Sequence, residues 1–198
     1  TVTATDRFRL ASRTLVPASV RQTAWAATVN GEDLRNALTD LRRSHGSGSR
    51  PPRTGCRFDH PTGGVIAIAG CSPTPSPTTG RCWTPCPPVT TRVEISTTAL
   101  LRALEDLHSD RIELAVGASA VTLRDGESGN DIRLDARVLG PELDIWFEMI
   151  TLYPGISTAI GAEVLIDFRG DAQPATVRSA DRGDLTTLVM PTAHPSTV

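Results

Sequence analysis

The sequence predicts an α+β fold in which helices cover one face of antiparallel sheet, and an internal repeat is the first observation behind this prediction. Residues 29–43 (VNGEDLRNALTDLRR) align without a gap with residues 95–109 (ISTTALLRALEDLHS). In each copy four apolar residues fall on one face of a helix. A residue suited to N-capping precedes each helix, Asn30 in the first copy and Ser96 in the second. The repeat therefore predicts two amphipathic helices in equivalent structural units.

The order of elements after residue 90 is the second observation. Segments that alternate apolar and polar residues predict strands, because successive side chains of a strand point to opposite faces. Strands are expected at 92–95, 111–116, 120–125 and 131–138, and again at 143–147, 163–168, 175–180 and 185–190. The second half has a poor, Pro- and Gly-containing helix at 151–161. Residues 91–192 thus read as two copies of strand–helix–strand–strand–strand, and two such halves side by side make an α+β domain.

Composition excludes several classes of function. The chain has 198 residues and a net charge of -2, with no lysine, so there is no global basic field for nucleic acid. No apolar run reaches membrane-spanning length, and we expect a cytoplasmic protein. The four histidines are scattered, no acid is paired for acid–base work, and there is no phosphate-binding loop. We therefore expect neither catalytic residues nor a cofactor, and not an enzyme.

Two motifs near the ends of the chain carry a resemblance to a known family. Residues 4–15 (ATDRFRLASRTL) resemble the middle-domain signature of the bacterial DNA polymerase III β subunit, the sliding clamp. Residues 174–191 (PATVRSADRGDLTTLVMP) resemble the C-terminus of the same family, with its A-D-x-G-D turn and final L-V-M-P. The clamp-like C-terminal part of actinobacterial MerR-type transcriptional regulators carries nearly the same motifs and is the alternative.

The resemblance implies a domain organisation and a function. Residues 1–90 correspond to an incomplete middle domain, and residues 91–198 to the last domain of a clamp. Since the first clamp domain is absent and the chain starts without Met, we expect a fragment. A clamp is a non-catalytic scaffold that tethers a polymerase to DNA in replication, at most an accessory subunit of the polymerase. A homodimer is expected for the full-length protein. In the alternative, the module serves for dimerisation or partner binding in a DNA-binding transcriptional regulator.

The resemblance also implies a cleft that binds short apolar peptide motifs of polymerases or repair proteins. Its residues carry over onto Thr5, Arg9, Leu10, Ala172, Leu188, Met190 and Pro191. Leucine and methionine suit an apolar anchor site, and methionine adapts to different partners. The alternative is that Leu10, Leu188 and Met190 are ordinary strand core. Arg7, Thr192 and Ala193 depart from the family pattern, which puts the affinity for partners in doubt.

A second expected surface is the set of helices that would face DNA. Clamps hold duplex DNA through basic side chains that contact phosphates without reading bases. The candidates are Arg35, Arg42, Arg43 and Arg102. Acids on the same helices oppose these arginines, and the helix at 151–161 has no charge. We therefore expect weak, non-specific contact with duplex DNA.

The segment 46–87 breaks the repeat and is expected to be irregular. It holds all four cysteines (Cys56, Cys71, Cys82, Cys86) and is rich in Pro, Gly, Ser and Thr. A metal site is one interpretation, although the cysteines do not form paired knuckles. A natural linker is another. The third is that the segment is out of frame: read one base earlier with GC-rich codons, residues 72–88 allow LPDPFPDYRAMLDALPP, which resembles the segment before the last clamp domain. We favour this third hypothesis, and no metal site is assigned.

Overall fold

The computed structural model describes a defined part of the chain. The described residues are 2–5, 8–13, 31–32, 34–35, 56–59, 65–68, 87–125, 129–181 and 185–193, with backbone alone at 56–59 and 65–68. The chain divides into two compact units, one made of Thr1–Val16 with Cys86–Val198 and the other of Pro17–Pro85. Residues from the two ends of the chain share the first unit because their strands pair. The division at residue 90 into two clamp-like domains stays a prediction.

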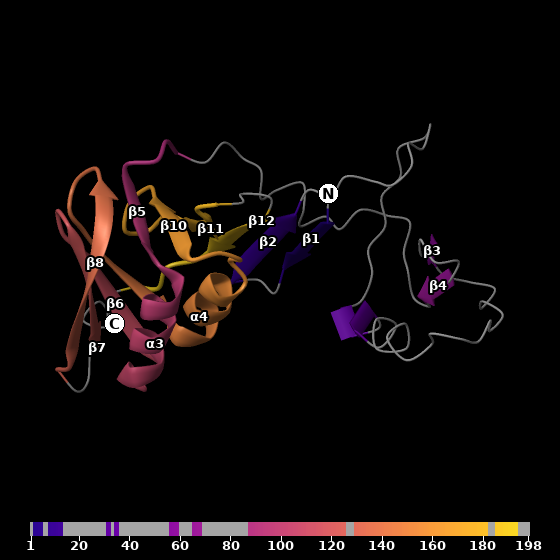
Figure 1. Cartoon of the computed structure of the whole chain (residues 1–198), viewed down its shortest axis with the longest axis horizontal. Helices are drawn as coiled ribbons and strands as arrows, with labels where there is room; N and C mark the ends of the chain where they lie inside the picture. Colours follow the sequence, from indigo (N-terminus) through magenta and orange to yellow (C-terminus); the bar gives the residue numbers. More distant parts are fainter. Residues whose placement is uncertain are drawn as a thin grey trace. The chain divides into compact units, whose positions relative to one another are not determined.

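The first unit is built on one antiparallel sheet with two helices. Among the described residues, ten strands follow the order β1-β2-β12-β11-β10-β5-β8-β7-β6-β9. Their bounds are β1 Val2–Thr5, β2 Arg9–Arg13, β5 Thr91–Ser96, β6 Arg111–Val116, β7 Ala120–Asp125, β8 Asp131–Leu139, β9 Leu143–Glu148, β10 Glu163–Phe168, β11 Ala175–Ser179 and β12 Leu185–Val189. The helices are α3 Thr97–Leu107 and α4 Met149–Ser157. They lie side by side on the same face of the sheet (Figure 1). This confirms the predicted fold class.

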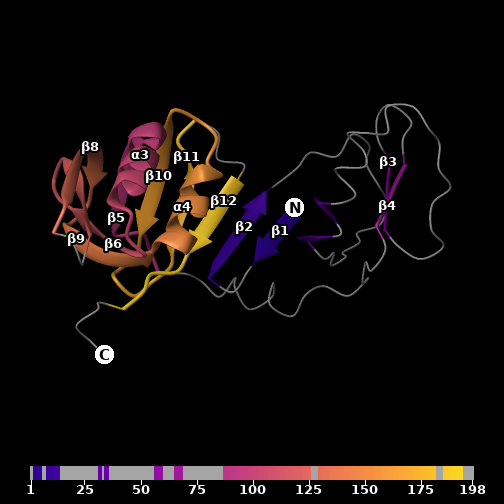
Figure 2. The same cartoon turned by 90° about the horizontal axis from the view of Figure 1, so that it is seen from below.

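The twofold repeat organises the sheet. In each half a strand leads into a helix and three further strands follow, as predicted. The first strand of one half, β5, pairs with β10 of the other, and β9 pairs with β6 in the same exchanged manner. Each half therefore completes the sheet of the other, which ties them into a single core. Beyond β12 the sheet continues through β2 to β1 (Figure 2).

Helix α3 forms as the apolar spacing predicted. Ser96 caps its N-terminus by accepting a hydrogen bond from the Ala99 backbone N–H, at 3.4 Å. His108 ends the helix in the left-handed conformation, at φ 51°. The four residues expected on the apolar face are all buried: Leu100, Ala103, Leu104 and Leu107. They pack in one cluster with side chains from both halves of the sheet, including the fully buried Phe147 and Phe168.

Helix α4 differs from the predicted bounds. It covers Met149–Ser157, whereas a helix at 151–161 was expected. The early start has a local reason, because the Met149 backbone N–H donates to the Asp110 carbonyl at 2.8 Å and so satisfies a free donor of the first turn. The early end has another, because the Ala159 N–H donates to the Ile156 carbonyl at 3.0 Å, a tighter turn that stops the helix.

The segment 46–87 is not wholly irregular, which corrects the expectation for eight of its residues. Strand β3 (Cys56–Asp59) pairs antiparallel with β4 (Val65–Ile68). The run VIAI of β4 is rich in β-branched residues, which fit a pleated strand. The other residues of the segment up to residue 86, with Cys71, Cys82 and Cys86, lie outside the described residues, and the linker, metal and frame hypotheses stay open there.

In the part of the chain that the structure describes, no helix is long and apolar enough to span a bilayer.

Candidate functional site

The pairing of β2 with β12 joins the two motifs that lie at opposite ends of the chain. Leu10 of β2 is the register partner of Leu188 of β12, and Thr5 of β1 is in turn the partner of Leu10. Directly opposite side chains of antiparallel strands lie on the same face. Thr5, Leu10 and Leu188 therefore form one row across three strands. Leu10 is buried, Leu188 is partly exposed and Thr5 is exposed.

This row lies on the face of the sheet that the helices leave uncovered. Gly155 of α4 approaches Val189 so closely that an added Cβ would lie 2.7 Å from the valine Cγ2. Val189 therefore points toward α4, and its neighbour Leu188 points away from the helices. Arg9 is the register partner of Val189, so its side chain is on the helix side of the sheet. The structure thus separates Arg9 from the Leu10–Leu188 row, although sequence reasoning grouped them.

Met190 extends the apolar row beyond the end of β12. Its backbone N–H donates to the Phe8 carbonyl at 3.0 Å, which holds the two residues side by side. Met190 is 41% exposed and Phe8 is 56% exposed, so both side chains present apolar surface to solvent at the same place. Sequence reasoning did not single out Phe8, although its place in the ATDRFRLA motif, between two arginines, was a signal.

Ala172 and Pro191 line a pocket of about 260 Å³. Ile145 and Trp146 of β9 form another part of its wall. The tail is held there because the Thr192 N–H donates to the Trp146 carbonyl at 2.8 Å. The structure therefore brings Ala172 together with Pro191, and Met190 precedes Pro191 directly in the chain. Sequence reasoning predicted a strand at 143–147 but did not single out Trp146.

The surface of the described helices carries little positive charge. Arg102 of α3 is exposed, but Glu105 and Asp106 follow it on the same helix, and α4 has no charged residue. Tyr153 of α4 donates a hydrogen bond to Glu105 Oε1 at 2.5 Å. This hydrogen bond, with smaller contributions from desolvation and from the charge of Glu105, raises the pKa of Tyr153 above the usual 10.0.

The other residues expected to face DNA are only partly described. Arg35 is exposed, and Arg42 and Arg43 lie outside the described residues. Within the described ranges there is also no group of three or more His, Cys, Asp or Glu placed to hold a metal ion.

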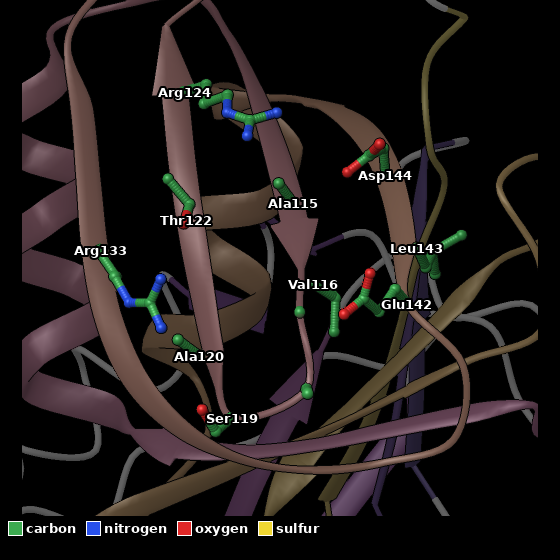
Figure 3. A pocket seen from close by; sticks show the side chains of 12 residues that line it. Ala115, Val116, Ser119, Ala120, Thr122, Arg124, Arg133, Glu142, Leu143 and Asp144 are labelled. Carbon is green, nitrogen blue, oxygen red and sulfur yellow. The ribbon is translucent and has the colours of Figure 1, made fainter.

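A larger, polar hollow lies elsewhere, on the uncovered face around β6 and β7 (Figure 3). Its volume is about 610 Å³, and its floor is made mostly of small residues. Arg124 and Arg133 lie on one side of it, and Glu142 and Asp144 lie on the other. The positive and negative charges balance, so the hollow favours no one charge of ligand.

The comparisons with known proteins give a result at the level of the fold. No family model matches this sequence, and no curated protein matches it. Solved structures do match, with 305 chains found. The sliding clamp of Bacillus subtilis aligns with a TM-score of 0.77 at 19% identity, over 97% of this chain and 53% of the clamp chain. The chain has the fold of a bacterial DNA polymerase sliding clamp.

Two further clamps match with similar scores. The DNA polymerase III β subunit of Pseudomonas aeruginosa has a TM-score of 0.77 at 17% identity, over 96% of this chain and 54% of its own. The sliding clamp of Bartonella birtlesii, solved with bound griselimycin, has a TM-score of 0.75 at 17% identity, over 97% of this chain and 54% of the Bartonella chain. This clamp-like chain therefore spans about half the length of the clamps that it matches.

Proposed function

We propose that this chain is a clamp-like, non-catalytic scaffold whose uncovered sheet face binds short apolar peptides of a DNA polymerase or a repair protein. The observation that carries the proposal is the Leu10–Leu188 pair at the β2–β12 junction, continued by Met190. Leu188 is partly exposed and Met190 is exposed, and the buried Leu10 supports them; apolar side chains that reach solvent together mark a binding surface more often than they mark a core. The solved structures described above are all clamps, so we do not pursue the regulator module.

The role in replication rests on the fold and is proposed for the full-length protein. A clamp tethers its polymerase by holding the enzyme through a peptide and the DNA through a ring. This chain has a candidate site for the peptide of the polymerase. The basis for holding DNA is weak, because helices α3 and α4 together carry one arginine against two acids. We therefore place the function of this chain in partner binding, with duplex DNA as a weak, non-specific contact and a homodimer as the expected assembly.

Peptide binding is tested by fluorescence anisotropy on the whole chain. The probe is a labelled decapeptide that contains Gln, Leu and Phe, and griselimycin is a second probe because the Bartonella clamp binds it. Met190→Ala removes an exposed apolar contact that a bound peptide would cover. Covering part of a methionine side chain contributes roughly 1–1.5 kcal/mol, so the Kd of the peptide should rise about five- to tenfold.

A matched control separates the site from general stickiness. Leu139 lies on the same uncovered face, since it pairs with Arg92 across β5 and β8, and it is 61% exposed. Leu139→Ala removes as much exposed apolar surface far along the sheet from Met190, and it should leave the Kd unchanged. Binding that fails to saturate, or that weakens equally in both variants, would contradict the proposal.

A further inference from the structure

A cluster of arginines stands next to the candidate peptide site on the same uncovered face. It is built around Asp167 of β10, whose side chain is 6% exposed. Arg92 contacts this carboxylate through Nε at 2.6 Å and Nη2 at 3.1 Å. Arg178 of β11 contacts it through Nη2 at 3.3 Å. Two guanidinium groups therefore share one buried carboxylate.

A third arginine increases the imbalance of charge. Arg169 Nη1 donates to Thr176 Oγ1 at 2.6 Å, and Thr176 is the register partner of Asp167. Three arginines around one acid leave an excess of two positive charges. Glu94, another acid on this face, has its own partner in Arg137 at 3.4 Å. The cluster is thus a net positive patch on an otherwise mixed face.

The arginines also keep capacity for a further acceptor. The side chains of Arg92 and Arg178 are 41% and 34% exposed, so parts of both guanidinium groups reach solvent. A guanidinium has five N–H donors in a planar fork that suits a carboxylate. The geometry fits an incoming carboxylate better than it fits a neutral group.

The position of the cluster relates it to the apolar row. Leu188 pairs with Thr176, Thr176 pairs with Asp167, and Asp167 pairs with Arg92. Neighbouring strands lie about 4.8 Å apart, so Asp167, which both guanidinium groups contact, lies roughly 10 Å from Leu188 and Arg92 lies roughly 15 Å away, while Arg178 reaches Asp167 from the adjacent strand β11. An extended peptide rises about 3.3 Å per residue, so this span corresponds to about three or four residues.

We propose that the peptide partner carries an Asp or Glu three or four residues from its apolar anchor, and that Arg178 and Arg92 bind this carboxylate. The inference rests on the proposed function, because the apolar row must hold the anchor. It adds a requirement on the partner that the apolar row does not impose: one acid at a set distance. Charge complementarity then selects among the many apolar peptides of a cell.

The test compares peptides that differ in one charge. Labelled decapeptides carry a Leu–Phe anchor and a Glu either three or four residues away, on the N-terminal or the C-terminal side, and each has a Gln twin. On the whole wild-type chain, one Glu peptide should bind about three- to tenfold more tightly than its twin at 0.05 M NaCl. The advantage should fall toward one at 0.5 M NaCl, because a partly exposed ion pair is screened.

Variants locate the effect. Arg178→Gln should remove the advantage of Glu over Gln while leaving the affinity for the Gln peptide within about twofold, as expected for a rim contact. Arg133→Gln is the matched control, since Arg133 is exposed on the same face but on β8, and it should keep the advantage. If circular dichroism shows that Arg178→Gln does not fold, Arg92→Gln replaces it. The salt dependence of the Glu advantage on the wild-type chain tests the inference without any variant.

The outcomes separate the two proposals. If both members of every peptide pair bind equally well at low salt, the arginine cluster has no role in binding and the inference is wrong while the peptide site stands. If Arg133→Gln loses the advantage as fully as Arg178→Gln does, the effect is one of net charge, and the inference is again wrong. If no peptide binds at all, the proposed function itself fails.

Discussion

The contact between α4 and β12 makes Gly155→Ala an informative perturbation. An added Cβ at Gly155 would lie 2.7 Å from Val189 Cγ2, closer than real Cβ contacts come. Val189 has 0% exposure and a branched side chain with one favoured rotamer, so it cannot swing away. Either α4 or β12 must move. The substitution therefore tests whether the helix really lies directly on the strand that carries the candidate site.

Two opposing effects set the expected magnitude. Alanine favours a helix interior over glycine by about 1 kcal/mol. Overpacking a well-packed core costs typically about 1–3 kcal/mol. Because the contact is with a rigid, fully buried side chain, the overpacking cost falls in the upper part of this range, about 2–3 kcal/mol, and Gly155→Ala should lower the free energy of unfolding by roughly 1–2 kcal/mol. With a urea m-value of about 2 kcal/mol/M, the midpoint should fall by roughly 0.5–1 M.

Urea denaturation followed by circular dichroism measures this change. Gly117→Ala is the control, because the added Cβ would meet only the Ala120 carbonyl oxygen at an ordinary 3.6 Å, and its midpoint should be unchanged. Val189→Ala makes room for the added Cβ at position 155. The double variant Gly155→Ala with Val189→Ala should therefore lose less free energy of unfolding than the two single variants lose in sum. If Gly155→Ala is as stable as the wild type or more stable, the close packing of α4 on β12 is wrong.

Three further predictions concern the surface of the helices and the segment 46–87. Tyr153 is the one tyrosine of the chain, so absorbance at alkaline pH reports it alone. Glu105→Gln should bring its raised pKa down toward 10.0; the same pKa after this change would show that the hydrogen bond is absent. Because the folded pKa is raised, the stabilisation is fully present below the ordinary pKa and is lost as the pH rises through the raised value. Duplex DNA should bind weakly at physiological salt and lose affinity steeply as salt rises, and replacing Arg42 and Arg43 together should abolish what remains; tight, salt-insensitive binding to one sequence would contradict the clamp-like surface. Sequencing the gene across residues 46–87 in several isolates tests the frame hypothesis, which an intact reading frame in all of them would exclude.

The local pattern of the sequence determined the elements of the C-terminal half. The strands at 111–116, 120–125 and 163–168 have the predicted bounds, because apolar alternation with period two is a property of neighbouring residues and needs no tertiary information. The same holds for the buried face of α3. Helix α4 was displaced, because its start depends on a hydrogen bond to Asp110, which is distant in sequence.

The composition of the candidate site depended on tertiary structure. Residue motifs predicted that Leu10, Leu188, Met190 and Pro191 belong to one surface, but only the β2–β12 register placed Leu10 opposite Leu188. The same register puts Arg9 on the other face, since a shift of one residue along a strand reverses the side chain. A sequence motif does not say on which face of the sheet each side chain lies. The pairing of its strand with the neighbouring strand decides that face.

The arginine cluster was beyond the reach of sequence reasoning for a similar reason. Arg92, Asp167 and Arg178 come from three strands and share no motif, and each is an unremarkable charged residue in an alternating segment. They meet because β5, β10 and β11 are neighbours in the sheet. The sequence by itself determined which segments become strands and helices, since that choice is local. The folded chain decided which charges face each other, because strand order and register are properties of the whole sheet.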